Sequence, residues 1–113
     1  MTNLAPYILL AAAHVFHPAA EPRLRVEPSC RAAAKLEASD AQTYKDCMQD
    51  ELEAKNEVAK KWVRFRAEAR TRCSTQVMAG GDPSYVELLE CLEMDHAVED
   101  LSHEAHEGQK PTR

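Results

Sequence analysis

The chain has 113 residues, of which 29% are charged and only 5% aromatic, and its formal net charge at pH 7 is −5. This length suits one small domain with a small apolar core. The acidic balance argues against nucleic acid as a partner, because phosphates call for patches of Lys and Arg. Four cysteines without a CxxC pair indicate disulfides in an oxidising compartment rather than a metal site.

The N-terminal residues 1–20 are interpreted as a secretory signal segment. Residues 7–16 read YILLAAAHVF, and small residues follow at Ala19 and Ala20. This apolar run is much shorter than the about 20 residues of a membrane-spanning helix. We therefore predict a periplasmic or secreted protein without a membrane span once the signal is removed. The alternative is an N-terminal segment that is mobile or loosely docked. The Pro-containing residues 21–29 are predicted to be a linker.

Residues 30–102 are predicted to form a helical domain, which begins with a short and a long helix. Ser29 can cap a helix from Cys30 to about Ala38, and a second helix from Asp40 reaches Phe65 without any Gly or Pro. The apolar residues of the long helix recur with a helical period, which predicts one stripe that needs cover. The stripe comprises Tyr44, Cys47, Met48, Leu52, Val58, Ala59, Trp62 and Phe65.

After Phe65 the helical pattern continues to about Met78. One uninterrupted helix over this range would be unusually long, so we expect a bend near Arg66–Glu68. The strongest turn signal in the chain is Gly80-Gly81-Asp82-Pro83.

A final helix is predicted to begin at Ser84, because Glu87 three residues later completes a capping box. Its apolar residues occupy positions 85, 88, 89, 92, 98 and 101. The polar residues 103–113 are predicted to be a disordered tail. Because no strand pattern occurs in the sequence, the predicted fold class is all-α: a small, disulfide-stapled antiparallel bundle of three or four helices.

Four cysteines allow three pairings. Cys30 and Cys47 lie nearly symmetrically about the break at Ser39, and Cys73 and Cys91 lie nearly symmetrically about the Gly80–Pro83 turn. Residues equidistant from the turn of an antiparallel helical hairpin face each other. We therefore predict the disulfides Cys30–Cys47 and Cys73–Cys91, each of which would contribute about 3 kcal/mol by restricting the unfolded chain.

Charge is segregated along the sequence. Residues 55–72 carry seven Lys and Arg residues against Glu57 and Glu68, whereas Cys73–Gln109 contains nine carboxylates and no Lys or Arg. The basic and acidic helices either pair along their edges, where single ion pairs contribute little, or leave an acidic face for a basic protein partner. The candidate binding residues of that face are Glu87, Glu90, Glu93, Glu99 and Asp100.

No catalytic residue, cofactor site or metal site is predicted. His96, Asp100 and His103 share one helical face, but clusters of this kind at polar helix ends are usually solvated, and the chain has no HExxH motif. Paired cysteines leave no thiol nucleophile, and the Gly80-Gly81 pair is explained by its turn. Trp62 is interpreted as a core residue of the apolar stripe rather than as an exposed anchor for a partner.

The order of these markers is similar to that in the LprI-like lysozyme-inhibitor domain of exported bacterial proteins. The chain resembles a divergent relative of this family. The resemblance covers about residues 30–95, and its markers are Cys30, Thr43, Cys47, Trp62, Phe65-Arg66, Cys73, Gly80-Gly81 and Cys91. It implies a small helical domain, export and a role outside the cytoplasm, and lysozyme inhibition is the activity for which the family is named. The shared positions look structural, so the resemblance assigns no inhibitory residue.

Two non-enzymatic functions follow as expectations. The first is an exported envelope protein that binds or inhibits a basic enzyme such as lysozyme. The alternative is a structural or accessory module of an envelope or membrane assembly, without a soluble target.

Overall fold

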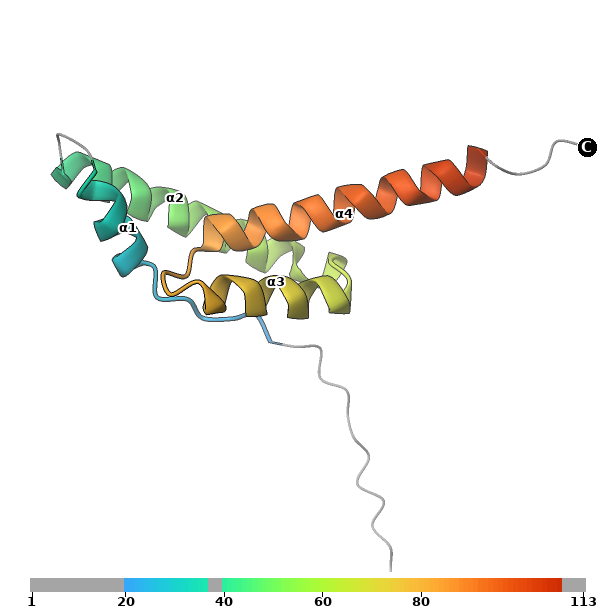
Figure 1. Cartoon of the computed structure of the whole chain (residues 1–113), viewed down its shortest axis with the longest axis horizontal. Coiled ribbons are helices and arrows are strands. Elements are labelled where there is room, and N and C mark those ends of the chain that lie inside the picture. Colours follow the sequence, from blue (N-terminus) through green and yellow to red (C-terminus); the bar gives the residue numbers. More distant parts are fainter. Residues whose placement is uncertain (1–19, 37–39, 109–113) are drawn as a thin grey trace, which may run out of the picture.

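The computed structural model describes residues 20–36 and 40–108, and within these ranges it contains helices and no strand. The predicted all-α, disulfide-stapled fold is therefore confirmed (Figure 1). The elements are the helices α1 (Glu27–Ala34), α2 (Asp40–Lys61), α3 (Ala67–Ala79) and α4 (Tyr85–Gly108), with the 3-10 helix η1 (Trp62–Arg64) after α2. The predicted signal segment lies almost entirely in residues 1–19, outside the described residues.

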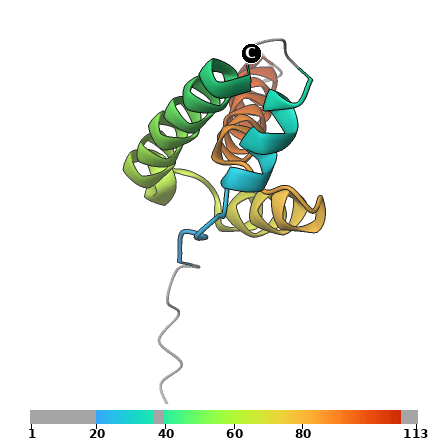
Figure 2. The same ribbon diagram turned by 90° about the vertical axis from the view of Figure 1, so that its left-hand side faces the viewer.

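The helices form two hairpins, α1 with α2 and α3 with α4, which meet where α2 packs against α4 (Figures 1 and 2). Each predicted disulfide is present inside one hairpin. Cys30 and Cys47 join α1 to α2 with Cα atoms 5.4 Å apart, and Cys73 and Cys91 join α3 to α4 with Cα atoms 5.7 Å apart. Both bonds indicate that the chain folds in an oxidising compartment outside the cytoplasm.

The first helix begins earlier than predicted, at Glu27 instead of Cys30, and ends at Ala34. The reason is Pro28, which lies in the first turn, where its missing N–H costs nothing and its fixed φ suits a helix. The cap position is Val26 and makes no side-chain hydrogen bond, so Ser29 is not the cap. The predicted break at Ser39 lies outside the described residues.

The predicted linker is bound to the domain rather than separate from it. Residues 20–26 have no regular secondary structure, yet Val26 belongs to the core. Leu24 donates its backbone N–H to the Tyr85 hydroxyl at 2.9 Å, and that hydroxyl donates to the Pro22 carbonyl at 3.2 Å. The domain therefore starts before Cys30, because this segment covers the first turn of α4.

The bend between α2 and α3 is confirmed. Phe65 and Arg66 both have extended backbone, with ψ of 144° and 146°, and they separate η1 from α3. Phe65 is buried, so the break turns its ring into the core while the chain reverses direction. The turn before α4 is also confirmed at Gly80–Pro83. Gly81 adopts φ of 86°, which is accessible to Gly without strain.

The core lies between α2, α3 and α4. Trp62 is 7% exposed and packs there with Val58, Ala69, Leu88 and Leu92, which confirms the interpretation of Trp62 as core. The predicted stripe of α2 is partly wrong: Leu52 is 58% exposed and Ala59 is also on the surface. The buried face of α2 instead runs through Glu51, Ala54 and Val58, and includes a charged residue.

Helix α4 runs to Gly108, six residues past the predicted end of the domain at residue 102. The residues between, HEAHEG, contain no breaker before the final Gly, and Ala and Glu favour helix. Residues 109–113 of the predicted tail lie outside the described residues. Among the helices of the described ranges, none combines the length and apolarity needed to cross a membrane.

Candidate functional site

The first turn of α4 is held by a buried carboxylate on α2. Glu51 is only 4% exposed, and it accepts one hydrogen bond from the Ser84 hydroxyl and one from the Tyr85 backbone N–H at 2.6 Å. Ser84 also accepts from the Glu87 backbone N–H at 3.3 Å, which is the cap that the sequence predicts. The carboxylate lies at the positive end of the α4 dipole. Glu51 therefore fixes where α4 begins and how it meets α2.

The five predicted binding carboxylates lie on α4 but do not form one unpaired set. Glu93 accepts a 2.9 Å hydrogen bond from Lys61, and this contact raises the pKa of the Lys61 ammonium. Glu99 lies 3.0 Å from Arg66, and Asp100 lies 3.6 Å from His96. Glu87 and Glu90 are exposed and have no ion-pair partner among the described residues.

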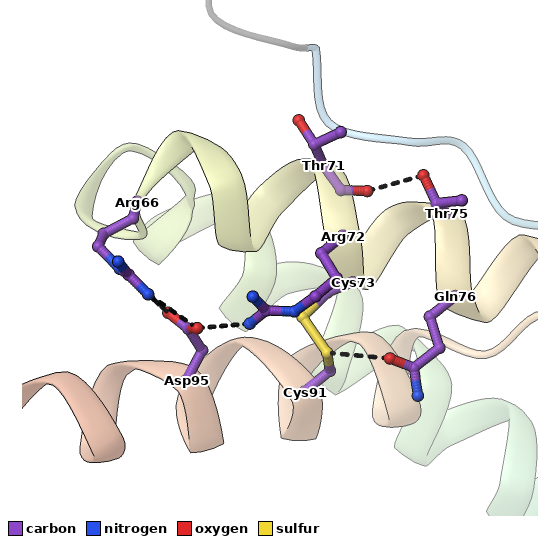
Figure 3. The surroundings of a disulfide bond; sticks show 8 residues. All are labelled: Arg66, Thr71, Arg72, Cys73, Thr75, Gln76, Cys91 and Asp95. Carbon is purple, nitrogen blue, oxygen red and sulfur yellow. Dashed lines mark hydrogen bonds and ion pairs between the residues drawn. A yellow bond between two sulfur atoms is a disulfide. The ribbon is translucent and has the colours of Figure 1, made fainter.

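Asp95, which the sequence reading did not single out, is the centre of the charge pairing between α3 and α4 (Figure 3). Arg66 donates to its carboxylate at 3.0 Å and 3.1 Å, and Arg72 donates to the same carboxylate. Its side chain is 9% exposed. The hydrogen bond from Arg72, and after it that from Arg66, lowers the pKa of Asp95 despite partial burial, which acts in the opposite direction.

Basic and acidic helices thus pair along their edges in part, as the first interpretation of the charge pattern expects. The pairing takes up the carboxylates that contact Lys61 at the end of α2, Arg66 just before α3 and Arg72 on α3. Exposed acidic side chains remain on the rest of α4, at Glu87, Glu90, Glu104 and Glu107. Helix α4 has no Lys or Arg that could neutralise them from within.

An open groove of about 790 Å³ separates part of α3 from α4 beside the Cys73–Cys91 disulfide. Val77 and Cys91 lie along it with Met94 and Val98, and its polar lining comes from Arg72, Gln76, Glu87, Glu90 and Asp95. Cys91 contacts the Gln76 side chain at 3.9 Å (Figure 3). The groove is open to solvent, so it suits the side chains of a docked protein segment better than an enclosed small molecule.

The apolar residues of α4 do not form one buried stripe, although the sequence reading groups them together. Tyr85, Leu88 and Leu92 are buried, whereas Val98 is 58% exposed and Leu101 is 65% exposed. Met94 is 70% exposed and was not part of the predicted stripe. The signal that separates the two sets is present in the spacing, because 94, 98 and 101 fall on a different face of a helix from 88 and 92.

The histidines of α4 do not assemble with carboxylates into a cluster. His96 lies 3.6 Å from Asp100, and His103 lies 3.8 Å from Glu99, each one helical turn apart. Within the described residues, no three His, Cys, Asp or Glu side chains are arranged to hold a metal ion. These pairs are ordinary neighbours along a solvated helix.

Comparison of the chain with models of known protein families, with curated proteins and with solved structures finds no match.

Proposed function

We propose that this protein is an exported, non-enzymatic binding protein whose partner is a basic protein, and that its binding surface is α4. Lysozyme is the specific candidate partner, because the order of cysteines, Trp and Gly residues resembles the lysozyme-inhibitor domain named above. The oxidising compartment indicated by both disulfides is one in which an exported inhibitor would meet such an enzyme.

One observation carries this proposal: the charge of α4 is of one sign and is only partly neutralised. Lys61, Arg66 and Arg72 pair with three of its carboxylates. The remaining exposed acidic side chains, together with a net charge of −5, attract a cationic protein and speed its association.

Surface plasmon resonance against a basic lysozyme, at low and at physiological salt, tests the proposal. The informative variant reverses the exposed carboxylates Glu87, Glu90 and Glu104 to Lys, because none of these has an ion-pair partner among the described residues. We expect the association rate to fall by about tenfold or more, and to fall for the unaltered protein as salt rises.

A matched control separates the effect of this surface from that of net charge. Asp46, Asp50 and Glu53 are exposed on α2, and their reversal to Lys changes the net charge by the same amount. This control should retain most of the association rate. Equal losses in both variants would refute α4 as the binding surface, and no binding at low salt would exclude lysozyme as the partner.

The second candidate function is an accessory module of an envelope or membrane assembly. The exposed apolar side chains Met94, Val98 and Leu101 favour it, because a helix face of this kind suits a stable protein–protein contact. Co-purification of the native protein with a membrane assembly, without inhibition of lysozyme, would support this function over the first.

A further inference from the structure

Helix α4 has a second apolar face that the domain does not cover. Met94, Val98 and Leu101 are 70%, 58% and 65% exposed, and they follow one another at spacings of four and three residues. This is the spacing of side chains that form a seam along one side of a helix. We call these three residues the α4 seam.

The α4 seam lies on the flank of the helix that borders α3, next to Cys91. Tyr85, Leu88 and Leu92, which α4 packs into the core, lie on a different face of the helix. Past Asp100, every residue of α4 up to Gly108 is exposed, and this part of the helix projects beyond α3 (Figure 1). The seam is therefore accessible over two turns.

The seam starts in the groove between α3 and α4. Met94 and Val98 line this groove, and Val77, which is 5% exposed, supplies an apolar side chain from α3. A helix laid along the seam would thus contact α4 throughout and α3 at one end. Seams with anchors at i, i+4 and i+7 are the usual contact of an amphipathic helix with its groove.

Unpaired negative charge lies along one border of the seam and at its start. By helical position, Glu90 and Glu104 lie along one border, and Glu87 lies in line with the seam at its start; all three are exposed. Among the described residues that line the groove, Arg72 supplies the one basic side chain, and it already pairs with Asp95. A partner helix with Lys or Arg beside its apolar residues is complementary to this acidic border, and one with acidic residues is not.

We propose that the α4 seam docks an amphipathic helix of the partner protein, with an apolar stripe flanked by Lys or Arg. The positive charge of that helix rests on the proposed function, in which the partner is basic. A second copy of this chain fits less well, because it would bring the acidic borders of two seams together. An anionic membrane surface is disfavoured for the same reason, since it attracts basic amphipathic helices.

The test uses the full-length, oxidised protein and three synthetic helical peptides of three heptads each. The first peptide has a stripe of Leu at the positions that would face the α4 seam, and Lys at the positions on either side of that stripe. The second replaces those Lys residues by Glu, and the third has the composition of the first in scrambled order. Fluorescence anisotropy should show that the first peptide binds at least about tenfold more tightly than either of the others.

The decisive variant replaces all three seam residues by Ser: Met94→Ser, Val98→Ser and Leu101→Ser. A matched control replaces three other exposed apolar residues, Leu36, Leu52 and Val63, by Ser. We expect the seam variant to bind the first peptide at least about tenfold more weakly and the control variant to bind it as the unaltered protein does. Circular dichroism should show that both variants are folded, because all six side chains lie on the surface.

The outcomes separate this inference from the proposed function. Lysozyme binding that the seam variant retains in full would overturn the seam while leaving the acidic surface intact. The unaltered protein could bind the first peptide but not lysozyme. If the seam variant then fails to bind that peptide, the result would support the seam as a docking site and exclude lysozyme as the partner. Binding of the scrambled peptide as tightly as the first, or a dimer in sedimentation that the seam variant abolishes, would overturn the proposal.

Discussion

Replacing Glu51 by Ala should destabilise the domain far more than its place in the middle of a charged helix suggests. Its carboxylate is 4% exposed and accepts hydrogen bonds from Ser84 and Tyr85, which are 33 and 34 residues away in the sequence. Truncation removes both bonds and leaves the buried Tyr85 N–H without its acceptor. It also weakens the contact between α2 and the first turn of α4, the candidate binding helix, which the packing of Tyr85 and Leu88 still holds.

The expected loss follows from opposing contributions. Hydrogen bonds to a charged group contribute about 1.5–3 kcal/mol each, and an unsatisfied buried donor costs about 1–3 kcal/mol. Against this, the variant avoids burying a carboxylate and regains about 1.5–2 kcal/mol of side-chain entropy. We expect the free energy of unfolding to fall by about 2–3 kcal/mol, which corresponds to a Tm lower by about 10–20 °C in a domain of this size.

Urea unfolding followed by circular dichroism, with the disulfides intact, measures this loss. Glu53→Ala is the matched control, because Glu53 is exposed on the same helix and accepts a 3.3 Å hydrogen bond from its helix neighbour Gln49; it should change stability by less than about 0.5 kcal/mol. A double-mutant cycle with Ser84→Ala should give a coupling of at least about 1 kcal/mol. Equal stabilities of the Glu51 and Glu53 variants would refute the reasoning.

Two further predictions concern the core and the charge pairing. Trp62→Ala should lower the free energy of unfolding by about 3–5 kcal/mol. The control Val63→Ala should have little effect, because the neighbouring Val63 is 80% exposed. Similar Tm values for the two variants would show that Trp62 is not a core residue. Arg72 and Arg66 lower the pKa of Asp95 in the folded state. The resulting stabilisation is therefore complete above the pKa of an unfolded Asp, about 3.9, and is lost as pH falls through the lowered folded value. Unfolding measured between pH 6 and pH 3 should show a smaller loss of stability in Asp95→Asn than in the unaltered protein, and parallel losses would contradict this role.

Features that depend on neighbours in the sequence could be predicted without the structure. The Gly80–Pro83 turn, the bend after Phe65 and the cap at Ser84 arise from local backbone preferences. The disulfide partners follow from the predicted break at Ser39 and the Gly80–Pro83 turn, because two residues at equal distance from the turn of a helical hairpin face each other. Even so, the predicted start of α1 is wrong, since Pro28 lies in its first turn, whereas the prolines before Cys30 predict a linker.

The buried face of α2 could not be predicted from its own pattern. The apolar period predicts that Leu52 is covered and does not include Glu51, whereas in the structure Leu52 is exposed and Glu51 is buried. A carboxylate is tolerated in the core only where donors meet it. Those donors come from the start of α4, and they reach the Glu51 carboxylate only when the two hairpins pack together.

The sequence by itself determined that α4 is acidic, because it contains no Lys or Arg between Cys73 and Gln109. It also determined that apolar residues recur along this helix. Only the tertiary structure decided which of these side chains remain available. Asp95 is taken up by Arg66 and Arg72, while Glu87 and Glu90 stay exposed. Leu92 is covered, and Leu101 is left in solvent because α4 projects beyond α3 (Figure 1). Charge and hydrophobicity belong to the residues, but their availability to a partner depends on which elements pack against them.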